Sequence, residues 1–566
     1  MALSHKPITS FTHLQDCFSI FFAFVQKRRL WTSLICGAVS VLSLAPIYWW
    51  PVLFLTLPTL TYLLYDTLQN RTEFRKPILF SAFIGWCFGF GYFMAGLYWM
   101  ASALLVEADK FAWAIPLTAL LPASLALFYA MATALPAVLF KYVGKTPLIS
   151  APKKERYISI PLFILALSLS FAVLEWIRGH ILTGFPWNSI GQGWAGNDYL
   201  LQSASLVGIH GLNFFTPLIF ASPAVLFHTG QRHIKYKRDT LFFVGMMVFL
   251  VCAFIFGIIR LPANHSDNQR TFNKNVRLRL VQPNIPQYKK WDSKYRDWAI
   301  QKYLDLSHTN PAGQKDNLSS ITHLIWPEVA WPVLMAQDPE SLAKIAGLLP
   351  EGKHLITGSL RVETNDQAQR YYNSLIVFDD AAQVTSIYDK KHLVPFGEYL
   401  PLQSLLEAIG LKQLTRLKGG FTPGSQLRLM NAPGLPDFSP LICYEIVFPN
   451  KVIEHDARPK WLLNITNDAW FGATAGPHQH LHQARLRAVE EGLPVIRVAN
   501  TGISAVISPY GMVSQSLPLE SSGVIDTSLP SPLNPTLYAQ QRDHLFFGIL
   551  VLGAIFLIFG LHTYNR

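Results

Sequence analysis

The segment LFFVGMMVFLVCAFIFGII, residues 241–259, contains no charged residue and is long enough to cross the hydrocarbon core of a bilayer. A membrane-spanning helix needs about 20 consecutive and mainly apolar residues. Arg260 ends this run, and a long polar block of mixed charge follows it. The boundary therefore separates a membrane part of the chain from a soluble part.

Further apolar segments lie on both sides of this boundary. The candidates for membrane helices lie near 30–48, 49–66, 78–100, 113–140, 159–177, 206–228, 241–261 and 545–562. One such segment alone can be a buried helix of a soluble protein, but eight in this order predict a multi-pass membrane protein. We therefore expect an eight-helix transmembrane bundle with a soluble domain inserted before the last helix.

The composition agrees with this division. Of the 566 residues, 51% are hydrophobic and 14% are charged, whereas an average soluble domain has about 25% charged residues. These values exclude a disordered chain, a collagen-like repeat and an ordinary cytosolic enzyme. We expect a membrane domain of seven helices at 1–262, a soluble domain at 263–540, and the eighth helix with a short tail at 541–566.

Lysine and arginine residues are concentrated in alternate loops. They occur near the N-terminus and after the second, fourth and sixth candidate helices, while the other loops are nearly bare. Because positive loops stay in the cytoplasm, both termini are expected there and residues 262–540 outside. Much of the net charge of +12 is this topology signal, so it does not indicate nucleic-acid binding.

The polar block predicts an α/β domain. Short strands are expected at Val276–Val281 (half-buried, because apolar and basic residues alternate), His323–Trp326, Ser374–Phe378, Val384–Tyr388, Leu441–Tyr444, Trp461–Ile465 and Val495–Val498. Two hairpins are expected, 374–388 turning at Asp379–Asp380 and 503–515 turning at Pro509–Gly511. Helical patterns at Lys294–Leu306 and His480–Glu491 lie between strands. Interleaved strands and helices indicate stacked sheets with helices outside.

Three polar residues lie where expected strands end: Glu328 after Leu324–Trp326, Lys390 after Ile387–Asp389 and Cys443 after Leu441-Ile442. Cys443 is the only cysteine of the polar block, so its thiol is either buried and inert or chemically used. If the three converge, the carboxylate can take the thiol proton and the ammonium can stabilise an oxyanion, which permits acyl transfer through a thioester. The residues alone equally allow three unrelated positions, a surface Glu, a solvated Lys and a core Cys.

The residues around these positions carry a resemblance. Trp326-Pro327-Glu328, the stretch Tyr388–Tyr399, Cys443-Tyr444-Glu445 and Asn467–Gly472 closely resemble the nitrilase superfamily. Together with the membrane segments and with Phe185-Pro186-Trp187, the chain resembles the membrane-embedded apolipoprotein N-acyltransferases of bacteria over nearly its whole length.

The resemblance implies a fold and a set of site residues. The fold is an αββα sandwich on a bundle of eight membrane helices. The implied site comprises Glu328 as general base, Lys390 as oxyanion-stabilising residue, Cys443 as nucleophile, Glu398 and Glu445 as supporting carboxylates, the backbone N–H of Tyr444 in the oxyanion hole, and Trp291 near the substrate entrance.

The resemblance also implies an activity. The enzyme takes an acyl chain from a phospholipid, typically phosphatidylethanolamine, in the inner membrane. It places the chain on the N-terminal diacylglyceryl-cysteine of apolipoproteins, by a ping-pong route through a thioester, on the periplasmic side and without a cofactor. This is the final step of lipoprotein maturation. Two alternatives remain: a membrane-anchored amide or nitrile hydrolase, and a non-enzymatic transporter or scaffold.

Three other signals do not alter this interpretation. Gly191, Gly193 and Gly196 match a dinucleotide fingerprint but follow a membrane segment and open no βαβ unit. The trio His478, His480 and His482 lacks a completing Cys or Glu, so no metal site is expected. Residues 402–417 form either a lid that dips into the bilayer or an ordinary packed helix.

Overall fold

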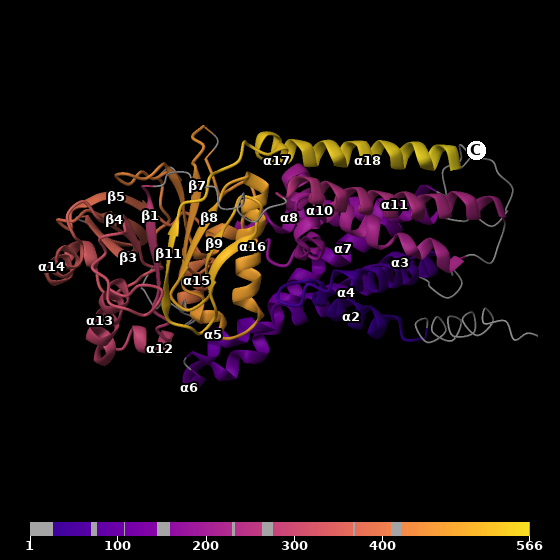
Figure 1. Cartoon of the computed structure of the whole chain (residues 1–566). Coiled ribbons are helices and arrows are strands. Elements are labelled where there is room, and N and C mark those ends of the chain that lie inside the picture. Colours follow the sequence, from indigo (N-terminus) through magenta and orange to yellow (C-terminus); the bar gives the residue numbers. More distant parts are fainter. Residues whose placement is uncertain are drawn as a thin grey trace, which may run out of the picture.

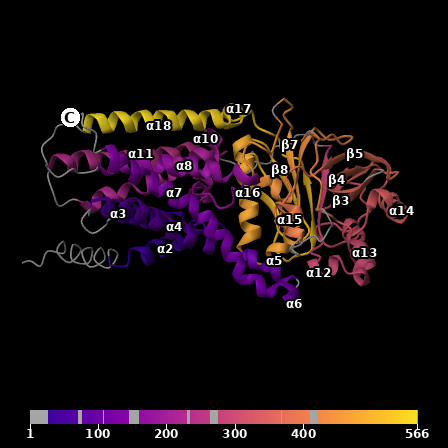
Figure 2. The ribbon, with the colours of Figure 1, turned by 180° about the vertical axis from the view of Figure 1, so that it is seen from behind.

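The structure is a computed structural model of the chain. It describes residues 27–69, 76–106, 108–143, 159–228, 233–262, 275–365, 368–408, 420–426, 428–454 and 456–564. A bundle of long helices forms one end of the molecule and an α/β sandwich forms the other (Figure 1). The same division is visible from behind (Figure 2).

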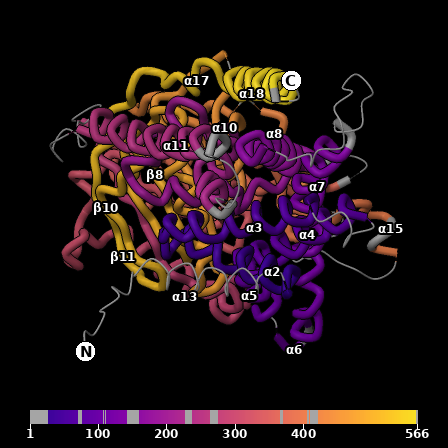
Figure 3. The backbone as a smooth tube through the Cα atoms, turned by 90° about the vertical axis from the view of Figure 1, so that its right-hand side faces the viewer, coloured from indigo at the N-terminus to yellow at the C-terminus, as the bar shows by residue number. Residues whose placement is uncertain are grey.

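The helices that precede and follow the sandwich come from both ends of the chain. They are α2 (Arg29–Ser40), α3 (Leu53–Gln69), α4 (Pro77–Gly96), α5 (Ala101–Leu105), α6 (Ala108–Phe111), α7 (Leu120–Val143), α8 (Ile160–Arg178), α9 (Asp198–Leu201), α10 (Ala204–Phe220), α11 (His233–Arg260), α17 (Leu537–Gln541) and α18 (Asp543–Tyr564). Seen end-on, the long helices lie side by side (Figure 3).

Six segments of the described chain are long and apolar enough to cross a membrane. They are Pro77–Gly96, Ala112–Lys141, Ile160–Arg178, Ala204–Leu226, Lys237–Arg260 and Asp543–Thr563. The first two expected segments form helices that are shorter, α2 with 12 residues and α3 with 17. Beyond α2, the chain makes a 3₁₀ turn at Val41–Ser43 rather than a continuous span.

The α/β end contains two sheets, both built from chain between α11 and α18. A six-stranded sheet has the order β11-β1-β2-β3-β4-β5, and a five-stranded sheet has the order β10-β9-β8-β7-β6. The strands are β1 (Arg277–Gln282), β2 (His323–Ile325), β3 (His354–Asn365), β4 (Ala368–Phe378), β5 (Val384–Asp389), β6 (Phe438–Ile442), β7 (Trp461–Thr466), β8 (Val495–Ala499), β9 (Ser504–Ile507), β10 (Val513–Leu517) and β11 (Gly523–Ser528).

Helices cover the outer faces of the two sheets. They are α13 (Arg296–Ser307) and α14 (Pro339–Leu348) on the six-stranded sheet and α16 (Ala475–Glu491) on the five-stranded sheet. The short helices α12 (Gln287–Lys290) and α15 (Gln403–Ala408) lie in loops of the same end. One apolar core lies between the sheets, and a second lies between the six-stranded sheet and the pair α13 and α14. The third core is continuous from the five-stranded sheet through α16 into the membrane helices. The α/β end is therefore packed onto the bundle and not merely tethered to it.

A glycine shapes the contact between α10 and α16. Gly208 has a φ of 61°, and a Cβ there would lie 2.1 Å from the ring of Tyr538. This break leaves the Ile209 N–H outside regular helix bonding, and it donates instead to the Glu490 carboxylate at 2.8 Å. The distorted helix thereby gains a direct hydrogen bond to the α/β end of the molecule.

Most strand expectations are confirmed, including both hairpins, β4 with β5 and β9 with β10. Two details are wrong. The strand expected at Leu441–Tyr444 ends at Ile442, because the chain turns sharply at the next residue. Strand β1 is almost wholly buried, because Arg279 lies inside and pairs with Asp316 and Asp526, both at 2.6 Å.

Candidate active site

Cys443 lies at a sharp turn between strand β6 and a short 3₁₀ helix, Cys443–Val447. Its φ of 51° is left-handed, a conformation that side chains with a Cβ rarely adopt. Such strain persists only where surrounding contacts hold it. Here the Cys443 carbonyl oxygen lies 3.1 Å from His480 Nε2 and 3.4 Å from Asn464 Nδ2, which donates to it. The turn presents a buried thiol at the strand end.

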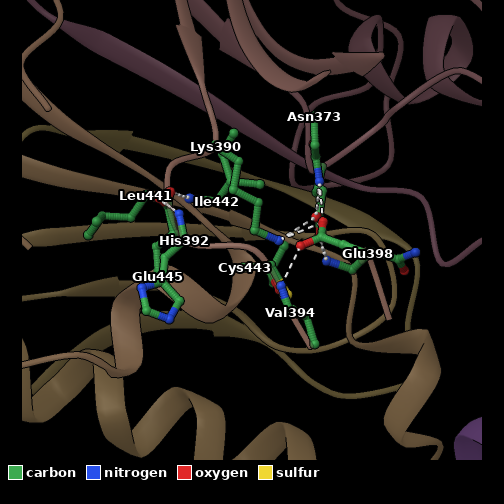
Figure 4. A network of polar contacts seen from close by, with 12 residues as sticks. Asn373, Lys390, His392, Val394, Glu398, Leu441, Ile442, Cys443 and Glu445 are labelled. Atoms are coloured by element: carbon green, nitrogen blue, oxygen red, sulfur yellow. Dashed lines mark hydrogen bonds and ion pairs between the residues drawn. The ribbon is translucent and has the colours of Figure 1, made fainter. Parts of the chain in front are cut away.

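Lys390 directly follows strand β5 and lies among carboxylates (Figure 4). Its Nζ is 2.9 Å from Glu398 Oε1 and 3.6 Å from Glu328 Oε1. The Asn373 side chain, on the neighbouring strand β4, donates to both carboxylates, at 2.8 Å to Glu328 and 3.1 Å to Glu398. The structure thus brings Glu328, Lys390 and Glu398 together in one buried cluster.

Glu328 is held on both sides. Its Oε2 accepts a hydrogen bond from the Asn467 N–H at 2.9 Å, and its backbone oxygen accepts one from Lys290 Nζ at 3.2 Å. The adjacent strand β3 passes so close that a Cβ at Gly358 would lie 2.6 Å from Glu328 Cα. Only glycine allows this approach, so the backbone of β3 helps to fix the carboxylate.

Burial and charge set the protonation of the cluster. Burial raises the pKa of the Cys443 thiol, and the nearby Glu328 carboxylate raises it further. Burial also raises the pKa of Glu328, although the Lys390 ammonium opposes this effect. Burial by itself lowers the pKa of Lys390, but Glu398 and Glu328 outweigh it and the net shift is upward. A neutral thiol therefore lies in electrostatic contact with a permanent cation and with a carboxylate of enhanced basicity.

Glu445 joins the two strand ends that carry the thiol and the ammonium. Its Oε2 accepts from the Ile442 N–H at 2.8 Å, immediately before Cys443. Its Oε1 accepts from the backbone N–H groups of Lys391 and His392, the two residues after Lys390, at 3.0 and 3.1 Å. The Arg428 guanidinium pairs with the same oxygen at 2.8 Å. This fully buried carboxylate sets the spacing of β5 and β6.

The remaining expected positions lie around this cluster. The Tyr444 ring stacks on Trp187, with centroids 6.4 Å apart and planes inclined by 15°. Trp291 lies at the end of helix α12 with 51% of its surface exposed. Its neighbour Lys290 is buried instead, and burial lowers the pKa of Lys290 to about 8.

Sequence reasoning missed a buried polar chain behind Cys443. His480 Nδ1 lies 2.9 Å from Asp468 Oδ1, and Arg497 pairs with the other Asp468 oxygen at 2.7 Å. Two members of this chain have a signal in the sequence: Asp468 lies in the quoted Asn467–Gly472 motif, and His480 belongs to the histidine trio at the start of a helical pattern. These polar contacts fix the His480 ring, which in turn lies against the Cys443 carbonyl.

A second missed residue, Gln479, connects the site to the membrane helices. Its Oε1 accepts hydrogen bonds from Trp99 Nε1 at 3.0 Å and from Trp187 Nε1 at 2.8 Å. Its Nε2 donates to the backbone oxygen of Gly96 at the end of α4, at 3.2 Å. Because Gln479 precedes His480, this contact joins the bundle to the polar chain behind the thiol.

Comparison with known families agrees with this architecture. Residues 277–533 match the carbon-nitrogen hydrolase family. Residues 36–222 match the apolipoprotein N-acyltransferase N-terminal domain. The two-sheet sandwich and these matches define the class, which is a membrane protein carrying a nitrilase-like catalytic domain.

Curated relatives extend the match over nearly the whole chain. An apolipoprotein N-acyltransferase of Rhodopseudomonas palustris is 41% identical over 91% of this chain and 92% of its own length. Relatives of the same name from Bradyrhizobium diazoefficiens and Brucella suis are 42% and 39% identical, covering 92% and 96% of their lengths. The chain belongs to the apolipoprotein N-acyltransferase family, and the protein is an acyltransferase.

Proposed function

We propose that this enzyme moves an acyl chain from a phospholipid, with phosphatidylethanolamine as the expected donor, to the N-terminal diacylglyceryl-cysteine of apolipoproteins. The observation that carries the proposal is the buried cluster of Glu328, Lys390 and Glu398 in electrostatic contact with Cys443. The relatives are named for N-acyl transfer to apolipoproteins.

The first half-reaction forms a thioester. Glu328 removes the proton of the Cys443 thiol, and the thiolate attacks the ester carbonyl of the phospholipid. Lys390 and the Tyr444 N–H stabilise the resulting oxyanion. When the tetrahedral intermediate collapses, the C–O bond breaks and Glu328 returns its proton to the departing lysophospholipid. The acyl chain is then bound to Cys443.

The second half-reaction uses the lipoprotein. Its α-amino group attacks the thioester carbonyl, and Glu328 accepts a proton from the attacking nitrogen. The C–S bond breaks, the Cys443 sulfur regains a proton, and an amide is formed. We assign Glu398 to balancing the charge of Lys390, Glu445 to holding the strand ends, and the exposed Trp291 to the entrance for lipid substrates.

The membrane arrangement suits two lipid-anchored substrates. We infer eight membrane helices, with α2 and α3 completing the six longer spans, and domains at 1–262, 263–540 and 541–566. The distribution of positive charge supports cytoplasmic termini and a periplasmic catalytic domain in the inner membrane. A site closed to water protects a thioester from hydrolysis. Residues 409–417 of the expected lid lie outside the described part of the chain.

Intact-mass measurement tests the proposal. The purified protein is incubated with a phospholipid of defined acyl chains, beside Cys443→Ala and Cys252→Ala variants. Cys252 is an exposed cysteine on α11 and controls for nonspecific acylation. We expect a hydroxylamine-sensitive gain of one acyl chain in wild type and Cys252→Ala, and none in Cys443→Ala.

Addition of a diacylated lipopeptide separates transferase from hydrolase. The transferase should lose its adduct only when the lipopeptide is added, with a matching gain of mass on the peptide. Spontaneous loss to free fatty acid, with no mass gain on the peptide, would favour the hydrolase alternative. An adduct that persists in Cys443→Ala would overturn the assignment of the nucleophile.

A further inference from the structure

Three residues from distant parts of the sequence meet near one end of the helical bundle. His180 follows helix α8, His210 lies in α10 and Asp543 begins α18. One nitrogen or oxygen of each lies within 4.8 Å of those of the other two. The His210 Nε2 and Asp543 Oδ1 atoms are 4.0 Å apart, and the two imidazole rings are 5.7 Å apart.

The polar atoms at the centre of this cluster lack hydrogen bonds. His210 is 2% exposed, and within the described chain neither of its ring nitrogens has a hydrogen-bond partner. The same holds for Asp543 Oδ1. Buried polar atoms are normally satisfied, because burial without a partner costs free energy. The cluster therefore presents buried ligand atoms that no hydrogen bond occupies.

We propose that His180, His210 and Asp543 bind one divalent transition-metal ion, with zinc the best fit. Imidazole nitrogens and a carboxylate are ligands that zinc accepts. Three protein ligands leave a fourth position for water. No sequence pattern indicated this site, because its ligands are separated by up to several hundred residues.

The second coordination shell is already formed. His180 Nδ1 lies 2.7 Å from the Trp176 backbone oxygen, so Nδ1–H donates there and Nε2 is left to bind the ion. Metal-binding histidines usually donate their second N–H to such an oxygen. The Trp176 ring stacks on His180 at 4.1 Å, and its Nε1 donates to Asp543 Oδ2 at 3.4 Å.

The geometry needs only a small closure. Zinc bonds of 2.0–2.1 Å in a tetrahedron separate ligand atoms by about 3.3 Å. The 4.0 Å gap between His210 and Asp543 must therefore shrink by less than 1 Å, and the other separations, which are at most 4.8 Å, by up to about 1.5 Å. Arg487, a buried cation, lines the same cavity as His210 and is paired with Glu490 at 2.8 Å.

The ion would fasten the last helix to the bundle. Only 17% of the apolar window of α18 is buried, so this helix has a limited packing surface of its own. Figure 1 shows α18 along one side of the bundle, with its first turn near the sandwich. A metal bond from Asp543 to α10 and to the end of α8 would hold that first turn in place.

Metal titration of the full-length protein in detergent micelles tests the site. The protein is stripped with chelator and titrated with Co²⁺, whose visible absorption reports tetrahedral coordination, and Zn²⁺ is added as competitor. The variants are His180→Gln, His210→Gln and Asp543→Asn. His544→Gln is the control, because His544 is exposed and adjacent to Asp543.

We expect one Co²⁺ per chain in wild type and His544→Gln, displaced by one equivalent of Zn²⁺. Each ligand variant should lower Co²⁺ affinity by at least ~100-fold. Zn²⁺ should raise the Tm of wild type and leave that of Asp543→Asn unchanged. Asp543→Asn preserves shape, so it remains informative if His210→Gln does not fold. Absence of binding in wild type, or equal affinity in the folded Asp543→Asn variant, would overturn the proposal.

Discussion

The Glu398 carboxylate lies 2.9 Å from the Lys390 ammonium, whereas Glu328 lies 3.6 Å from the same nitrogen. Glu398 is thus the closer counterion of Lys390. Glu328 remains free to accept a proton, although it lies near enough to respond to the cation. Two carboxylates beside one ammonium can therefore have different tasks, one structural and one chemical.

Neutral substitution of the two carboxylates should separate these tasks. Glu328→Gln removes the proposed base and should lower the rate of thioester formation by about 10²–10⁴-fold. Glu398→Gln should lower it by roughly 10–100-fold, because Lys390 then moves toward Glu328 and both are misplaced. Single-turnover acylation, followed by intact mass, gives both rates. Equal loss in the two variants would contradict the division of roles.

The pH dependence of acylation should report Glu328. Its pKa lies above the ordinary value of 4.5, mainly because the carboxyl is buried. The base form is lost as pH falls through this raised pKa, so the acid limb of the rate profile should be centred above pH 4.5. The measurement is the single-turnover acylation rate across pH. A limb centred below pH 4.5 would exclude Glu328 as the titrating base.

Substitution of Lys290 tests whether the acid limb of the acylation rate profile reports the pKa of Glu328. The Lys290 ammonium lowers the pKa of Glu328, in opposition to burial. Lys290→Gln should therefore move the acid limb to higher pH, while Lys344→Gln, at a partly exposed position on α14, should leave it in place. A shift to lower pH in Lys290→Gln would contradict this electrostatic account.

Glu445 should matter for stability as much as for rate. Glu445→Gln leaves the Arg428 guanidinium buried without its carboxylate, which should cost about 3–5 kcal/mol. The double variant Glu445→Gln with Arg428→Met should recover part of this loss, because no uncompensated charge remains. Thermal unfolding in detergent measures both. A double variant less stable than Glu445→Gln would show that Arg428 is stabilised by other contacts.

Gln479 should couple the bundle to the site. Gln479→Leu leaves the indole N–H groups of Trp99 and Trp187 buried without an acceptor, at about 1–3 kcal/mol. Because His480 is adjacent, acylation should also slow, whereas Gln301→Leu on the exposed face of α13 should change neither property. If the Gln479→Leu protein is less stable but its acylation rate is unchanged, Gln479 contributes to packing and not to the reaction.

Local pattern was sufficient for much of this architecture. Apolar segments of spanning length predict the membrane helices. Glu328, Lys390 and Cys443 each follow a short apolar run, which predicts reactive side chains at the ends of strands. These signals are local because hydropathy and strand propensity depend on neighbouring residues. The two hairpins were also predictable, since turn residues lie between their strands.

Other features depended on contacts between residues far apart in the chain. Asn373 donates hydrogen bonds to Glu328 and Glu398, and Gln479 accepts hydrogen bonds from two tryptophans of the helical bundle and its loops. Arg279 looked like the exposed side of a strand, yet two aspartates allow it to be buried. Burial, ion pairing and pKa depend on which distant segments the fold brings together, and the meeting of His180 with Asp543 is decided in the same way.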